Sequence, residues 1–63
     1  MKVGDIVMIK PDTRGFDKFK NSVGVVTSCV DEGWRDSAKI WKVQYQNMYA
    51  YTFLDDTQIE VLN

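Results

Sequence analysis

The stretch that decides the fold is WKVQYQNMYAYTF, which runs from Trp41 to Phe53. It holds five aromatic residues in thirteen, and nearly all of them occupy alternate positions. Successive side chains of a β-strand point to opposite faces. The alternation therefore predicts two strands, residues 40–46 and 49–53, joined by a turn at Asn47.

The number of residues in that turn decides which rings share a face. A turn of two or four residues pairs Tyr45 with Ala50 and sends Tyr49, Tyr51 and Phe53 to the opposite side from Tyr45. A turn of three residues pairs Tyr45 with Tyr49 and places every ring on one side. The first arrangement gives an exposed aromatic stripe, and the second gives a buried cluster.

Energetic magnitudes favour the buried cluster. Burial of a Phe-sized side chain contributes about 1.5–3 kcal/mol, whereas a domain this small has only about 5 kcal/mol of net stability. Asn47 also suits the left-handed position of a three-residue turn. We therefore expect the three-residue turn, with Tyr49 half exposed beside it. The rings expected in the core are Trp41, Tyr45, Tyr51 and Phe53.

Three further segments read as strands because they are rich in β-branched residues and bounded by turn-forming ones. They are DIVMIK (5–10), VGVVTSCV (23–30) and QIEVL (58–62). Gly24 inside the second predicts a bulge or sharp bend. LDDT (54–57) predicts a single helical turn, which an Asp caps. Five short strands with one helical turn predict an all-β domain, a five-stranded barrel spanning residues 1–63.

Composition limits the classes of function. Eight basic and nine acidic residues give a net charge of −1, unlike the basic balance of most nucleic-acid binders. No apolar run approaches the length of a signal peptide or membrane span, so no membrane partner is expected. Cys29 is the single cysteine. It predicts a reducing, cytoplasmic location, and we expect it to be a small buried hydrophobic residue.

Catalytic and metal-binding motifs are absent from the sequence. There is no His for acid–base work at neutral pH. A lone Cys without His makes no zinc site, and DEGWRD (31–36) lacks the spacing of a calcium loop. The adjacent pair Asp55 and Asp56 is better explained by capping. We therefore expect a protein that is not an enzyme and has no cofactor or metal.

The order of four motifs resembles the SH3-like small β-barrel superfamily. The motifs are KVGDIVMI, VGVV, WKVQYQN and QIEVL, and they span almost the whole chain. The resemblance implies a barrel with a long first loop and a helical turn before its last strand. Function does not follow, because this fold has many unrelated binding roles.

Three branches of the superfamily remain open. VGVV resembles the KOW-type barrels of transcription and ribosomal proteins, although FDKFKNS replaces their basic, Gly-rich lead-in. VMIKPDTRGF followed by VGVVTSCVD is similar to the ferredoxin-docking barrel subunit of photosystem I, whose basic site has no counterpart here. The aromatic residues resemble those of Tudor-like domains, whose cages bind methylated side chains.

Aromatic and basic residues in the loops are the candidate binding residues. Trp34 and Arg35 lie in a polar loop and are the residue types that most often anchor interfaces. The alternative is that Trp34 folds back as a lid over the barrel. In the first loop, residues 11–22, aromatic and basic residues interleave as in single-strand nucleic-acid grooves, although one ring is expected to plug the barrel. These residues are Phe16, Lys18, Phe19 and Lys20.

The sequence thus predicts a small binding module, a protein–protein adaptor or regulator of the kind found in phages and plasmids. Its contact residues are expected in both loops and at Tyr49, and it is expected to be a monomer or weak dimer. The alternative is a KOW-like nucleic-acid-binding domain acting in transcription or translation, with Lys18 and Lys20 as phosphate contacts.

Overall fold

The computed structural model describes residues 1–31, 39–46 and 49–63. They form five β-strands and one short 3-10 turn, so the chain is all-β, as expected. The strands are β1 (Ile6–Ile9), β2 (Gly24–Asp31), β3 (Ile40–Tyr45), β4 (Ala50–Asp55) and β5 (Ile59–Val61). The 3-10 turn η1 (Asp56–Gln58) lies between β4 and β5.

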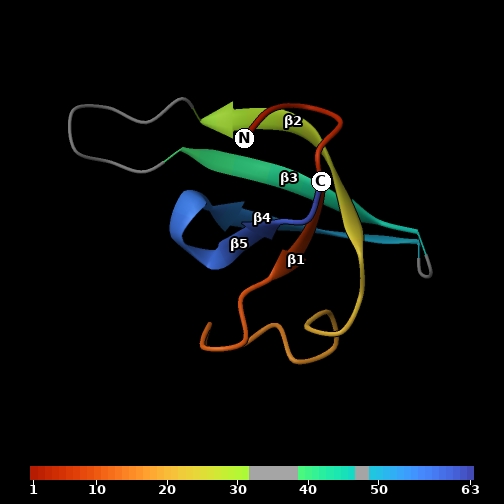
Figure 1. Cartoon of the computed structure of the whole chain (residues 1–63), viewed down its shortest axis with the longest axis vertical. Helices are drawn as coiled ribbons and strands as arrows, with labels where there is room; N and C mark the ends of the chain where they lie inside the picture. Colours follow the sequence, from red (N-terminus) through yellow and green to blue (C-terminus); the bar gives the residue numbers. More distant parts are fainter. Residues whose placement is uncertain (32–38, 47–48) are drawn as a thin grey trace.

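All five strands belong to one antiparallel sheet with the order β4-β3-β2-β1-β5 (Figure 1). The sheet bends strongly, and its chain ends lie near each other. No pairing between described residues joins β4 to β5, so these two strands are the edges of the sheet. The five strands and the helical turn before the last one are therefore confirmed.

The concave side of the sheet holds the hydrophobic core. Its buried members come from every strand because each strand contributes alternate residues. The core residues are Val7, Ile9, Val26, Trp41, Val43, Tyr45, Leu54 and Ile59. Cys29 packs partly buried against this cluster, and its thiol donates to the Asp31 carbonyl.

Gly24 allows two neighbouring strands to approach closely. A Cβ at this position would lie 2.5 Å from Cγ1 of Val43 and 3.2 Å from the Tyr45 ring. The bulge predicted at Gly24 is wrong. The register shifts of β2 lie further along, between Val26 and Ser28 and again before Asp31. The absence of a side chain at Gly24 provides space for the core side chains of Val43 and Tyr45.

The turn η1 begins with a capping box. The Asp55 side chain accepts from the Thr57 N–H, while the Gln58 side chain accepts from the Asp55 N–H. Capping by an Asp was expected, but β4 continues two residues beyond its predicted end at Phe53. The helical turn is displaced accordingly, because Leu54 remains in the sheet with its side chain in the core.

Candidate aromatic face on the β3–β4 hairpin

The register of the β3–β4 hairpin pairs Tyr45 with Ala50. Four residues, 46–49, therefore separate the paired positions. This even number sends Tyr51 and Phe53 to the convex side of the sheet, beside Gln44 and Lys42 respectively. The rings are 52% and 50% exposed, and Tyr49 is fully exposed.

The predicted three-residue turn is consequently wrong, and so is the expected burial of Tyr51 and Phe53. Trp41 and Tyr45 are buried, as expected. The energetic reasoning failed because it assumed free space on the concave side. Phe19 from the first loop stacks on Tyr45 there, with 4.8 Å between ring centroids. This packing supplies aromatic cover to the core from a segment far away in sequence.

Two rings and two polar side chains form what we call the aromatic face: Lys42, Gln44, Tyr51 and Phe53. The Tyr51 and Phe53 rings meet edge to face with 5.4 Å between centroids. The Lys42 amine lies 4.4 Å from the Tyr51 centroid, a cation–π contact. The Gln44 side-chain amide donates to the Ala50 carbonyl at 2.8 Å. These contacts hold the rings in fixed orientations at the surface.

The first loop presents the predicted candidates unequally. Phe16 and Phe19 are both partly buried against the core, so neither ring is a free surface anchor. Lys18 is exposed, whereas the Lys20 amine lies 3.4 Å from the Asp17 carboxylate. Of this group, Lys18 is therefore the most accessible charge.

The remaining predicted candidates are Trp34, Arg35 and Tyr49. Trp34 and Arg35 lie outside the described residues. The strand residues Asp31 and Ile40, which come before and after them in the sequence, are paired at the far end of β3 from Tyr45. Tyr49 directly precedes β4, at the end of the hairpin where Tyr45 pairs with Ala50. The sequence prediction did not include Lys42, Gln44, Tyr51 or Phe53 among the candidate contact residues. The even turn, which was the less favoured alternative, is the one that places the two rings beside Lys42 and Gln44.

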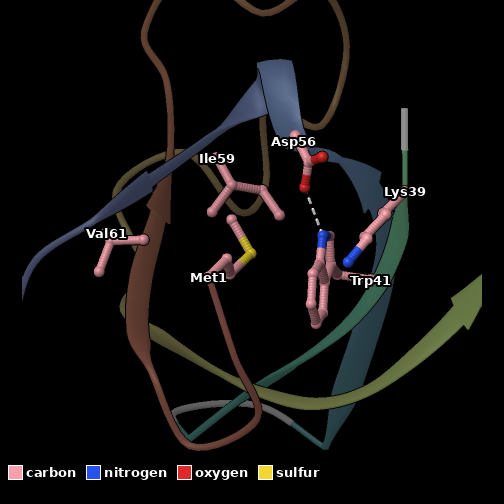
Figure 2. Close-up of a pocket in the computed structure, with 6 residues that line it drawn as sticks. All are labelled: Met1, Lys39, Trp41, Asp56, Ile59 and Val61. Atoms are coloured by element: carbon pink, nitrogen blue, oxygen red, sulfur yellow. Dashed lines mark hydrogen bonds between the residues drawn. The ribbon is translucent and has the colours of Figure 1, made fainter. Parts of the chain in front are cut away.

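A cavity of about 370 Å³ lies beside η1, at the Trp41 end of the core (Figure 2). Its lining residues are Met1, Lys39, Trp41, Asp56, Ile59 and Val61. The Trp41 indole N–H donates to the Asp56 carboxylate, and the Lys39 amine lies 5.9 Å from the ring centroid. Because the indole N–H already has this partner, we interpret the pair as a structural link between β3 and η1.

The buried hydroxyl of Tyr45 has a displaced pKa. Burial raises the pKa of its hydroxyl, and the hydrogen bond with the Thr52 hydroxyl at 2.9 Å offsets part of that rise. Both groups are buried and satisfy each other, so this pair is structural.

The described residues show neither a metal-binding cluster nor a membrane-spanning helix. Within residues 1–31, 39–46 and 49–63, no three His, Cys, Asp or Glu side chains group to hold a metal ion. In the same ranges, no helix has the length and apolar character to cross a membrane.

The aromatic face combines apolar, cationic and amide groups at the surface of the sheet. It offers two fixed rings, one ammonium group and one amide beside a sheet edge. Comparison of the chain with protein-family models, with curated proteins and with solved structures finds no match in any of the three.

Proposed function

We propose that this chain is a small non-enzymatic binding module that docks on another protein through the aromatic face. The single observation that carries the proposal is the exposure of Tyr51 and Phe53, side by side on an edge strand. Aromatic residues are enriched in the contact centres of protein interfaces. An adaptor or regulator in the cytoplasm, the role expected from the sequence, is the corresponding biological proposal.

Energetic reasoning favours the aromatic face, rather than the first loop, as the docking surface. Each half-exposed ring leaves unused about half of the roughly 1.5–3 kcal/mol available from full burial. A partner that covers both rings recovers that contribution without ordering a flexible segment, because their orientation is already fixed by contact with each other and with Lys42. The first-loop rings have already used most of their apolar surface within the core.

We further propose that the bent sheet is an SH3-like barrel. The strand order β4-β3-β2-β1-β5 and the 3-10 turn directly before β5 support this assignment. Such barrels place binding surfaces on strands and loops without catalytic groups, so the proposed fold and the proposed role are compatible.

Capture from a lysate of the source cells tests the proposed function. The bait is the tagged chain, compared with the variant Tyr51→Thr/Phe53→Thr, which places β-branched, strand-favouring residues at both positions. We expect a nuclease-resistant protein partner that the double variant no longer captures. Val3→Thr is the matched control because Val3 is 59% exposed and lies outside the face. Equal capture by the double variant and the control would remove the proposal.

Nucleic-acid binding is the second candidate. It is favoured by the Lys42 amine above the Tyr51 ring, since bases stack on such rings while amines contact phosphates. Lys18 and Lys20 remain the predicted phosphate contacts in the first loop. This candidate predicts capture that nuclease abolishes, and oligonucleotide affinity that falls steeply with salt. The net charge of −1 makes protein docking the stronger proposal.

A further inference from the structure

We infer that the partner of the aromatic face binds as an extended antiparallel strand added to the β4 edge, with an acidic side chain opposite Tyr51. This inference rests on the proposed function and specifies how the partner binds. It follows from the direction of the β4 main-chain groups and from the position of one lysine.

In each strand, alternate residues bond to the neighbour on one side and then to the neighbour on the other, and this phase shows which main-chain groups of β4 face outward. The Lys42 carbonyl accepts from the Thr27 hydroxyl on β2, so the main chain of Lys42 faces β2 rather than β4. Alternate residues of a strand bond to opposite neighbours. The β3 residues that bond to β4 are therefore Trp41, Val43 and Tyr45, whose partners are Leu54, Thr52 and Ala50.

The main-chain groups of Tyr51, Phe53 and Asp55 consequently point away from the sheet. The bond from the Asp55 N–H to the Gln58 side chain agrees with this direction, because that partner belongs to η1 and not to β3. Bonds elsewhere fit the same phase: the Val26 N–H donates to the Asp5 carbonyl, away from β3. The alternation is thus consistent across the sheet.

Four main-chain groups remain open at this edge, the N–H and C=O of Tyr51 and of Phe53. Outside the strand pairings, no hydrogen bond found between described residues involves any of them, and the phase of β4 directs them away from β3. An exposed row of unpaired donors and acceptors is a template for a further strand. The same two residues carry the exposed rings, so one extended segment satisfies the main chain and covers apolar surface together.

Charge identifies the side chain that such a segment needs. Lys42 belongs to β3, but its amine lies 4.4 Å from the Tyr51 ring centroid, over the edge strand. A strand added about 4.8 Å beyond β4 would place the residue opposite Tyr51 near that amine. A carboxylate there gains an opposite charge, while the residue two positions before it lies opposite Phe53 and meets that ring. The fitting segment therefore alternates apolar and acidic residues on one face.

Antiparallel addition matches the rest of the molecule. Every strand pair in the sheet is antiparallel, and this pairing is slightly more stable per residue than parallel pairing. Tyr51 and the residue opposite it would exchange both main-chain bonds, which fixes the side-chain faces of the added strand.

A synthetic peptide tests the inference with the intact chain. The probe is acetyl-Val-Thr-Glu-Thr-Val-amide, and the readout is amide hydrogen exchange resolved by NMR. In the free protein, we expect fast exchange at Tyr51 and Phe53 and slow exchange at Thr52 and Leu54, which bond to β3. With peptide at about ten times its dissociation constant, exchange at Tyr51 and Phe53 should slow by about tenfold.

Backbone methylation separates strand addition from simple side-chain docking. N-methylation of the Glu residue should abolish binding, because that N–H would donate to the Tyr51 carbonyl. N-methylation of a Thr residue is the matched control, because its N–H faces away from β4. Equal effects of the two methyl groups, or absence of binding by the parent peptide, would overturn the inference.

Charge reversal tests the role of Lys42. Replacing Glu by Lys in the peptide should weaken binding about two- to fivefold, and Lys42→Gln should remove that preference while protection of Tyr51 and Phe53 persists. Stronger binding of the Lys peptide would overturn the proposed acidic preference. A nuclease-resistant partner that leaves both amides in fast exchange would contradict strand addition but leave the aromatic face as a docking site.

Discussion

Strands β3 and β4 both carry rings at alternate positions, but the two sets lie on opposite sides of the sheet. Trp41 and Tyr45 of β3 are 5% and 2% exposed, whereas Tyr51 and Phe53 of β4 are about half exposed. The strands are paired, so the difference arises from register and not from composition. An aromatic alternation therefore predicts a strand reliably without predicting which face is buried.

The concave side shows why it accepts only one of the two sets. Opposite Tyr45 and Val43, β4 contributes the small side chains of Ala50 and Thr52. The remaining space beside Tyr45 is covered by Phe19, and the Thr52 hydroxyl pairs with the Tyr45 hydroxyl. Large rings at those β4 positions would overfill a core that is already packed, which costs stability as surely as a void does.

The largest expected effect contrasts the two strands directly. Trp41→Ala should lower the free energy of unfolding by about 3–5 kcal/mol, because it removes a buried ring and its bond to Asp56. Phe53→Ala should cost about 1 kcal/mol or less. Urea titrations followed by far-ultraviolet circular dichroism measure both. Similar losses for the two variants would break the contrast between inner and outer rings.

The second largest effect is expected for Gly24→Ala, which should lower the free energy of unfolding by about 1–3 kcal/mol. The added methyl group would lie 2.5 Å from Cγ1 of Val43, so the core must shift. Adding Val43→Ala should recover part of the loss specific to Gly24→Ala, measured as non-additivity in a double-mutant cycle. Strict additivity would show that the approach between these strands is looser than the structure indicates.

Tyr45→Phe tests the polar contact of the inner ring. The substitution should lower the free energy of unfolding by about 1 kcal/mol, because the buried Thr52 hydroxyl loses its hydrogen-bond partner. In the parent protein, burial holds the pKa of Tyr45 higher in the folded than in the unfolded state. Its contribution is therefore complete below about pH 10, the ordinary value for Tyr, and is lost as pH rises above it.

Chemical denaturation between pH 8 and about pH 11 tests whether the stabilising contribution of Tyr45 falls as the pH rises. The parent protein should lose more stability over this range than Tyr45→Phe does. An equal alkaline loss in both proteins would show that Tyr45 is not the group responsible.

The smallest stability effect is expected on the outer rings. Tyr51→Thr/Phe53→Thr should change the free energy of unfolding by about 0.5 kcal/mol per site or less, because both residues are half exposed and Thr favours strands. Thermal unfolding measures this change, and a large fall in midpoint would place the rings in the core. The same variant should nevertheless lose its partner, which separates function from stability.

The sequence predicted the five strands and the capped turn because those depend on local chemistry. Period-two alternation and β-branched residues identified β1, β2 and β3 within one residue at each end. The end of β4 was harder, since Leu54 and Asp55 are equally compatible with a strand and with a helical turn. The capping function of Asp55 follows from its own side chain, so it was predictable.

The face of β4 was not predictable in the same way. It depends on the parity of a four-residue connection and on Phe19, which lies 26 positions before Tyr45 in sequence and fills the space beside it. Asn47 favoured the odd connection, and no local feature contradicted it. The candidate site therefore shifted from loop residues to strand residues once the register was known.

Interstrand Hα–Hα nuclear Overhauser effects test the register most directly, because these protons are close at non-hydrogen-bonded antiparallel pairs. The structure predicts strong effects between Lys42 and Phe53 and between Gln44 and Tyr51. Effects from Lys42 to Thr52 and from Gln44 to Ala50 would instead establish the odd connection. That result would bury the β4 rings and remove the aromatic face.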